Sequence, residues 1–214
     1  MPRTRLCLVR HGETAWNAEG RVQGQTDVPL SGVGRAQARA VAGALTALAG
    51  ERFAALYASD LVRVTQTAAP AAENLALPVQ LDARLRERHY GLFEKLTYVE
   101  AKDRFPEDYL RFKLRDPDYD FESGESLLRF RARAIECLGA LVARHAGESI
   151  LVFTHGGVLE MAYRHATGKP LSSPRDFEIP NAAINWIEAG AQGWSVQVWA
   201  DCSHLAAALD DLPG

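Results

Sequence analysis

Two apolar runs of strand length each end in a histidine that is followed by glycine. The first is LCLVRHG, which delivers Arg10 and His11, and the second is ILVFTHGG, in which His155 precedes Gly156. A third apolar run, FAALYAS, leads into a predicted helix whose first turn holds Arg63. In open α/β sheets, ligands bind at the carboxyl ends of the strands. We therefore expect the two histidines and the two arginines to line one pocket.

Two guanidinium groups that converge with backbone N–H groups of glycine turns and helix N-termini form an anion site. Phosphate fits such a site because arginine forks match its oxygens. Neutral His11 can attack phosphorus if its other ring nitrogen donates to a backbone carbonyl. A cationic His155 beside the phosphoryl oxygens would stabilise the transition state. The structural alternative, a polar cap on a strand end, explains one such histidine better than two with both arginines.

Metal ligation is the remaining role for a pair of histidines. Two nearby arginines would repel a cation, and the spacing H-E-x-x-H is absent from the chain. We therefore expect neither a metal nor another cofactor.

A leaving alkoxide also needs a proton. The segment LRERHYG supplies Glu87, with His89 close by. A carboxylic acid in a pocket that excludes water can act as a general acid near neutral pH. The alternative for Glu87 is a solvated charge in a polar loop.

The composition restricts the class of protein. A chain of 214 residues with 47% apolar and 24% charged residues fits one α/β domain spanning 1–214. The net charge of −3 argues against nucleic acid or an acidic membrane surface as a partner. Three scattered cysteines and the lack of a membrane-spanning or signal segment favour a cytoplasmic protein. Assembly into a homo-oligomer stays open.

Strand-like and helix-like segments alternate, which favours a mostly parallel sheet between helical layers. Strands are expected at 6–9, 53–59, 79–85, 149–154, 182–190 and 194–200, and helices at 31–50, 61–75, 98–115, 125–145 and from 158 onward. Gly50 would end the first helix. The turn-rich stretch 115–126 is expected to be an exposed loop. We interpret 90–122 as a cap-like insertion.

Several motifs occur in a characteristic order: LVRHGETAWN, GQTDVPLSGVGRAQA, YASDLVRVTQTA, LRERHYG, SGESL and VFTHGGV. They resemble the histidine phosphatase superfamily, in its phosphoglycerate-mutase-like branch with an Arg-His-Gly signature. The likeness runs over nearly the whole chain. It implies a three-layer α/β/α sandwich and a phosphohistidine intermediate. It also implies that His11 is the nucleophile and Glu87 the proton donor.

The resemblance implies further roles around a small phosphorylated substrate. The residues that match the family's phosphate pocket and signature glycine are Arg10, Arg63, His155 and Gly156. Asn17 matches a polar residue at the end of the first loop, and Gln23 with Gly24 matches a second substrate-contacting turn. Tyr90 occupies a position that contacts glycerate in mutases.

The family contains phosphatases, which pass the phosphoryl group to water, and cofactor-dependent phosphoglycerate mutases. ERHYG looks like the mutase form of the acid motif, but Tyr98 stands where mutases have a lysine. The cations Arg111, Lys113 and Arg115 are spaced rather than adjacent, and the insertion is short for a mutase. We therefore favour a phosphatase over a mutase. A non-catalytic phosphate-binding relative is a weaker alternative, because the residues for catalysis are all present.

Overall fold

The computed structural model describes residues 2–48 and 51–206, and a six-stranded sheet forms its centre. The strands are β1 (Thr4–Arg10), β2 (Phe53–Ala58), β3 (Val79–Leu81), β4 (Ser149–Thr154), β5 (Ile184–Gly190) and β6 (Gly193–Asp201). Their order across the sheet is β3-β2-β4-β1-β5-β6. The first four are mutually parallel, whereas β5 runs antiparallel to β1 and to β6. The predicted mostly parallel sheet is confirmed.

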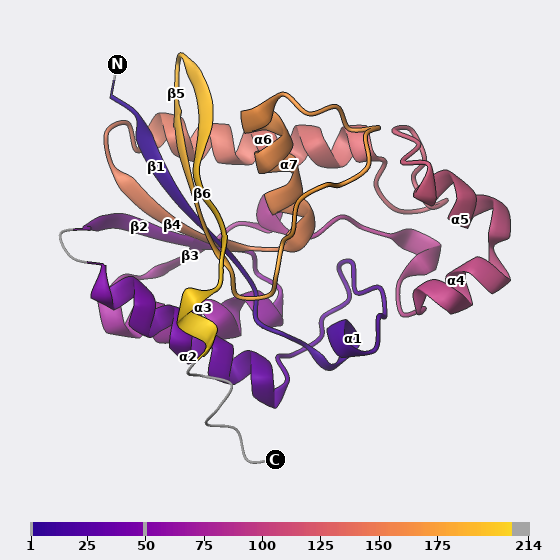
Figure 1. Ribbon diagram of the computed structural model, residues 1–214, viewed down its shortest axis with the longest axis horizontal. Coiled ribbons are helices and arrows are strands. Elements are labelled where there is room, and N and C mark those ends of the chain that lie inside the picture. The colour runs from indigo at the N-terminus through magenta and orange to yellow at the C-terminus, as the bar shows by residue number, and fades with distance from the viewer. Residues whose placement is uncertain (1, 49–50, 207–214) are drawn as a thin grey trace.

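Helices cover both faces of this sheet (Figure 1). The α-helices are α1 (Ala15–Ala18), α2 (Gly32–Ala47), α3 (Val62–Leu75), α4 (Tyr98–Arg104), α5 (Pro106–Lys113), α6 (Leu127–Arg144) and α7 (Gly156–Thr167). Short 3₁₀ turns are η1 (Ala83–Leu85), η2 (Gly91–Phe93) and η3 (Ser203–Leu205). Ser31 and Ser126 cap α2 and α6, each by accepting a backbone N–H bond at the first turn. Gly50, the predicted helix stop, lies outside the described residues.

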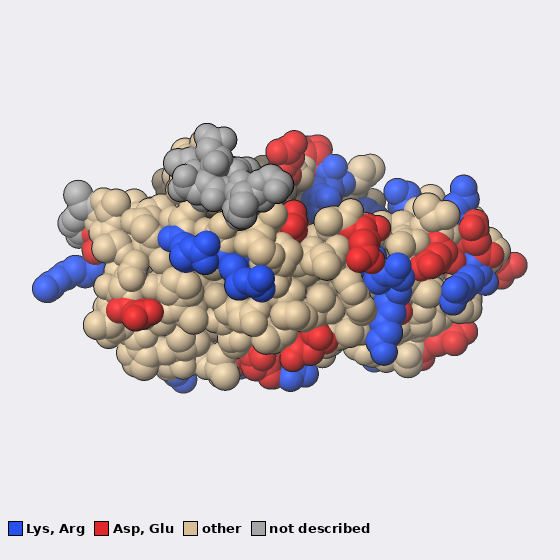
Figure 2. Space-filling model, turned by 90° about the horizontal axis from the view of Figure 1, so that it is seen from below, with Lys and Arg blue, Asp and Glu red and all other residues tan. Residues whose placement is uncertain are grey.

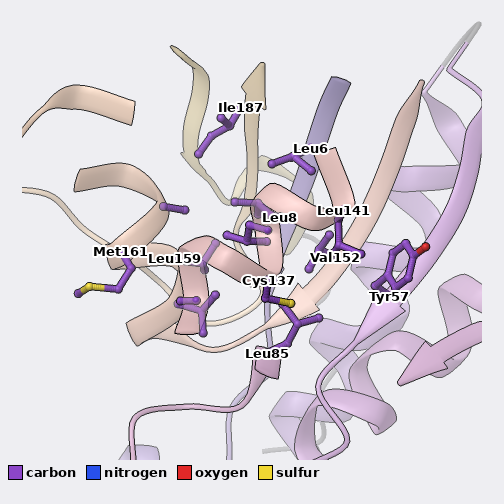
Figure 3. Packing of buried hydrophobic residues seen from close by; sticks show 14 of the residues in the cluster. Leu6, Leu8, Tyr57, Leu85, Cys137, Leu141, Val152, Leu159, Met161 and Ile187 are labelled. Atoms are coloured by element: carbon purple, nitrogen blue, oxygen red, sulfur yellow. The ribbon is translucent and has the colours of Figure 1, made fainter. Parts of the chain in front are cut away.

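Alternation along β1 divides the core into two layers. Leu6 and Leu8 face α6 and α7, whereas Cys7 and Val9 face α2 and α3. Figure 3 shows the first layer, in which Leu141 of α6 lies with the strand residues. This arrangement is the α/β/α sandwich that the family resemblance implied.

The segment 90–122, referred to below as the cap, carries α4 and α5 and lies beyond one end of the sheet (Figure 1). Its buried residues Phe93, Ala101, Tyr119 and Phe121 form a small apolar cluster with Val22, which follows α1. The prediction of one helix over 98–115 was wrong. Two helices form instead, because the chain leaves helical geometry at the residue before Pro106.

The structure corrects three further boundaries. The stretch 115–126 is not an exposed loop throughout, since Tyr119 and Phe121 are buried in the cap. Extended chain at 79–85 stops at Leu81, where η1 follows. Helix α7 begins at Gly156, two residues before the predicted start, because His155 at the end of β4 is already its N-cap.

None of the helices within the described part of the chain is long and apolar enough to cross a membrane. On the face seen in Figure 2, acidic and basic side chains are intermixed at the end that carries the cap. That face therefore offers no extended basic surface.

The start of α2 packs tightly on the loop after β1. A Cβ atom on Gly34 would stand 2.0 Å from the carbonyl oxygen of Glu13, whereas one on Gly43 of the same helix would meet nothing within 4 Å. We predict that Gly34→Ala destabilises the protein because two backbone segments must separate. Gly43→Ala should instead stabilise it by about 0.5–1 kcal/mol through helix propensity. Urea unfolding measures both, and equal effects of the two variants would contradict the close packing.

Candidate active site

Strand register brings the two predicted histidines together. Arg10 of β1 lies opposite Thr154 of β4, so the next residues, His11 and His155, leave the sheet side by side. The backbone N–H of His11 donates to the carbonyl oxygen of Thr154 at 2.9 Å. The two imidazole rings meet edge to face with centroids 5.3 Å apart, and both are buried. The carboxyl end of the sheet therefore holds a histidine pair.

His11 is arranged as a nucleophile. Its Nδ1 donates to the carbonyl oxygen of Gly12 at 2.7 Å, so the lone pair is on Nε2. Burial, reinforced by the charges of Arg63 and Arg10, holds the pKa of His11 well below its usual 6.5. The ring is therefore neutral at physiological pH, as attack on phosphorus requires.

His155 is held by a residue that the sequence analysis missed. The Ser59 hydroxyl accepts from the backbone N–H of Leu61 at 3.4 Å and lies 2.8 Å from Nε2 of His155. Because the described residues offer the hydroxyl hydrogen no other acceptor, we assign Ser59 as the donor to Nε2 and the ring hydrogen to Nδ1. This Nδ1 is buried and has no partner among the described residues. Ser59 directly follows the β2 run, so its place at a strand end was the signal that could have found it.

The expected positive charge on His155 needs correction. Burial, together with Arg63, His11 and Arg10, holds the pKa of His155 well below its usual 6.5. Without a bound anion, the His155 ring is therefore neutral at physiological pH. A neutral ring still presents the Nδ1–H donor, and a bound dianion favours its protonation.

The two predicted arginines are fixed by backbone carbonyls. One terminal nitrogen of Arg10 donates to Ile179, and Arg63 donates to Thr26 at 3.0 Å and Gly24 at 2.7 Å. The Nε atoms of both arginines are buried without a partner in the described part of the chain. Burial lowers both pKa values, that of Arg63 to about 10, although the charge of Glu87 opposes this. Both guanidiniums remain charged at neutral pH.

Glu87 lies between the sheet and the cap. Its carboxylate accepts from the backbone N–H of Arg88 at 2.7 Å and from that of Gly157, in the first turn of α7, at 3.0 Å. Gln25 and Arg133 donate to its carbonyl oxygen at 3.1 and 3.2 Å. Its side chain is therefore fixed at the same helix end that follows His155.

The turn 23–24 supports the pocket from the side of Arg63. Gly24 has a left-handed φ of 53°, which presents its carbonyl oxygen to Arg63. The Oε1 atom of Gln23 is buried and has no partner among the described groups. Gly156 opens α7 beside Arg10, whose Nε lies 3.4 Å from where a Cβ would stand.

In the described structure, Asn17 and Tyr90 form no hydrogen bond with the side chains of the two histidines. Asn17 is the partner of the N-cap Thr14 in the capping box of α1, where it accepts from the Thr14 backbone N–H at 3.1 Å. It also accepts from Asn181 at 3.4 Å. The same Asn181 amide donates to the carbonyl oxygen of His11 at 3.0 Å. Tyr90 lines a cavity of about 600 Å³ that reaches Gly157. Burial, and then the charge of Glu87, raises its pKa, so it remains a neutral phenol.

Glu94 is a second supporting residue that sequence reasoning did not identify. Its carboxylate accepts from the backbone N–H groups of Gln25 at 3.0 Å and Tyr90 at 3.1 Å, and from the Thr26 hydroxyl at 2.8 Å. It thereby joins the turn that holds Arg63 to the start of the cap. Its position in the polar run FEKLTYVEA offered no spacing signal.

Metal ligands are not assembled in the described ranges 2–48 and 51–206. Within them, no group of three or more His, Cys, Asp or Glu side chains is placed to hold a metal ion. The described site thus consists of imidazoles, guanidiniums and one carboxylate.

Residues 6–202 match the model of the histidine phosphatase superfamily (branch 1). The chain belongs to this superfamily. A metal-independent phosphoserine phosphatase of Arabidopsis thaliana is 37% identical over 95% of this chain and 84% of the relative. Phosphoglycerate mutase-like protein 4 of the same plant is 39% identical, over 94% and 86%. Among solved structures, Bacillus stearothermophilus YhfR has a TM-score of 0.86 at 33% identity, covering 94% of this chain and 99% of that one.

The comparisons confirm the resemblance inferred from the motifs. The matched region begins in β1 and ends just before η3, so it contains both histidines, both arginines and Glu87. The residues that the structure groups in the pocket of this histidine phosphatase therefore all lie in the region that matches the family.

The buried neutral histidines make stability depend on pH. Both have folded-state pKa values below 6.5, so below about pH 6.5 the unfolded chain binds more protons than the folded one. We predict that the free energy of unfolding falls as the pH drops from about 7.5 to about 5.5, by up to about 1.4 kcal/mol per pH unit for each histidine. His11→Gln should reduce this slope in urea titrations, and His89→Gln, at a half-buried position, serves as control. An unchanged slope in His11→Gln would contradict a neutral, buried His11.

The backbone N–H of Gly157 is one of the two that hold the Glu87 carboxylate in place. A Cβ atom at this position would lie 2.0 Å from Oε1 of Glu87 and 2.9 Å from the Phe130 ring. We predict that Gly157→Ala displaces the carboxylate and lowers kcat for alkyl phosphates by about tenfold or more. The neighbouring Gly156→Ala, which meets only the flexible Arg10 side chain, should lose much less. Steady-state assays compare the two, and a larger loss in Gly156→Ala would refute this placement of Glu87.

Proposed function

We propose that this chain hydrolyses phosphate monoesters of small metabolites through a phosphohistidine on His11. One observation carries the proposal: His11 is neutral, and three buried nitrogens of the site lack partners among the described residues. These are Nε of Arg10, Nε of Arg63 and Nδ1 of His155. Buried N–H donors normally have acceptors, and phosphoryl oxygens supply them here.

In the first step, the two arginines and His155 hold the phosphoryl oxygens while Nε2 of His11 attacks phosphorus. The bond from phosphorus to the ester oxygen breaks, and its electron pair leaves with the alkoxide. Glu87 in its protonated form gives that oxygen its proton, so an alcohol departs.

In the second step, water replaces the alcohol. The Glu87 carboxylate removes a proton from water as its oxygen attacks phosphorus, and the bond to Nε2 breaks. Inorganic phosphate leaves, and His11 and Glu87 return to their starting protonation states. The donors that bind the ground state also face the charge that develops in each transition state.

Transfer to water rather than to a second hydroxyl is favoured by the cap. Tyr98 occupies the position of the mutase lysine and lines the cavity. A phenol at this position lacks the positive charge of the mutase lysine. We therefore assign the phosphatase reaction, and the phosphoenzyme experiment below tests the mutase alternative.

We also place the protein in the cytoplasm. The thiols of Cys7 and Cys137 are fully buried, and no cysteine of the three is in a disulfide. Burial raises the pKa of Cys137 to about 12 and that of Cys7 further, so both remain thiols. Buried protonated thiols suit a reducing compartment.

The proton-donor role of Glu87 predicts a dependence on the leaving group. Glu87→Gln should reduce phosphorylation of His11 by an alkyl phosphate by about a hundredfold to ten-thousandfold, because an alkoxide leaves poorly without a proton. p-Nitrophenyl phosphate releases a stable phenolate, so its phosphorylation of His11 should suffer far less. Single-turnover rapid quench, with excess EDTA throughout, measures both rates.

Acid-labile, base-stable phosphate should accumulate on the Glu87→Gln protein and be absent from His11→Ala. Equal losses with both esters would remove Glu87 from the acid role and leave His89 as the candidate. Label on His11→Ala would overturn the nucleophile assignment. Efficient transfer from the wild-type phosphoenzyme to phosphoglycerate, with little free phosphate released, would favour the mutase.

A further inference from the structure

The reaction steps give no role to the cavity under the cap. It measures about 600 Å³ and meets the site at Gly157, whose N–H binds the Glu87 carboxylate. This volume equals that of about twenty water molecules and lies in the range of pockets for drug-sized ligands. A three-carbon phosphorylated acid would leave most of it unfilled.

One wall of the cavity is aromatic. In it, the rings of Tyr90, Tyr98 and Tyr109 each contact that of Phe112. Phe130 of α6 also lines the cavity. The rings of Tyr98 and Phe112 are stacked, with an interplanar angle of 10° and centroids 6.1 Å apart. Tyr90 meets Phe112 edge to face at 6.3 Å. Such a wall favours a flat, apolar group, because stacked and edge-to-face contacts add to the burial of its area.

The cavity also carries an excess of positive charge. Its charged lining consists of Arg88, Lys113, Arg115 and Arg175 against one acid, Glu160. Glu160 is already shared, since Arg115 and Arg164 of α7 donate to the same oxygen at 2.5 and 2.9 Å. Lys113 and Arg175 form no ion pair with any acid in residues 2–48 or 51–206.

Arg175 is the cation that joins this cavity to the catalytic pocket. It belongs to the exposed loop before β5 and lines the cavity beside Pro174. The pKa of Arg10 is lowered first by burial, and the charge of Glu87 opposes this. The positive charge of Arg175 is the next largest influence and lowers the pKa of Arg10 further. Arg175 and Gly157 line the same cavity, so a substrate that extends from the catalytic pocket into the cavity meets Arg175.

We propose that the substrate is the phosphate ester of an alcohol that combines a flat, largely apolar ring with a second anionic group. This rests on the proposed phosphatase function. The ring packs on the wall formed by Tyr98 and Phe112, and the anion binds Arg175, with Lys113 as a second cation. Phosphorylated three-carbon acids, which have the anion without the ring, are poor substrates by comparison.

Matched alkyl esters test the two halves of the proposal. Benzyl phosphate and 4-carboxybenzyl phosphate share a ring and the same type of leaving alkoxide but differ in the anion. 3-Phosphoglycerate has the anion without the ring. We expect kcat/KM for the carboxylated benzyl ester to exceed both others by about tenfold or more. Arg175→Gln should abolish the preference for 4-carboxybenzyl phosphate over benzyl phosphate. Tyr98→Ala should lower kcat/KM for both benzyl esters relative to that for 3-phosphoglycerate.

Control variants remove equivalent surface groups outside the cavity. Lys102→Gln takes an exposed cation from α4, and Val99→Ala takes an apolar side chain that is 69% exposed on the same helix. Both should leave the substrate ratios unchanged. If the wild-type protein has nearly the same kcat/KM for 4-carboxybenzyl phosphate and benzyl phosphate, the proposed binding of a second anion is overturned. A higher kcat/KM for 3-phosphoglycerate would overturn the ring half.

Two further results separate failure of this inference from failure of the reaction. If Arg175→Gln lowers kcat/KM for all three esters equally, Arg175 binds the reacting phosphate and the second-anion site is wrong. Phosphorylation of His11 by p-nitrophenyl phosphate is measured in parallel for every variant. Normal labelling without the expected preference rejects only the substrate class, whereas absence of labelling in the wild-type protein rejects the proposed function.

Discussion

Positive charge is difficult to keep in a buried pocket, and this difficulty determines how the site works. Desolvation and mutual repulsion oppose every cation there, but the guanidiniums of Arg10 and Arg63 retain their protons at neutral pH. The imidazoles of His11 and His155 release theirs instead. Neutrality makes one of them a nucleophile. The arrival of a dianion relieves the repulsion, so crowding that opposes folding favours binding of a phosphoryl group.

The surrounding backbone keeps this crowded arrangement in place. Register between β1 and β4 aligns the histidines, and the carbonyl oxygens of Gly24 and Thr26 fix Arg63. The N–H of Gly12 donates to the buried Thr67 hydroxyl at 3.0 Å, which ties the first loop to α3. Because backbone groups make these contacts, the donors are oriented before the substrate arrives, and little reorganisation is needed during the reaction.

Local patterns in the sequence were sufficient to predict the mostly parallel sheet and the polar residues that follow its strand ends. The strand ends at His11 and His155 are visible as apolar runs broken by polar residues, and the sheet topology then brings them together. Details inside the cap were mispredicted, because Phe121 and Tyr119 are buried without helical or strand periodicity, among residues distant in the chain. Glu94 was missed for the same reason, since its partners are turns brought near by tertiary folding.

The separate apolar cluster of the cap has an evolutionary consequence. Phe93 and its neighbours pack mainly on one another, so substitutions there need not disturb the layers that hold the sheet. Selection for a new metabolite can therefore act on one module while purifying selection preserves the chemistry in the other. Contacts between the two modules limit how independently they can diverge. They include the ion pair of Arg115 with Glu160 of α7 and the hydrogen bonds from Gln25 and Thr26 to Glu94.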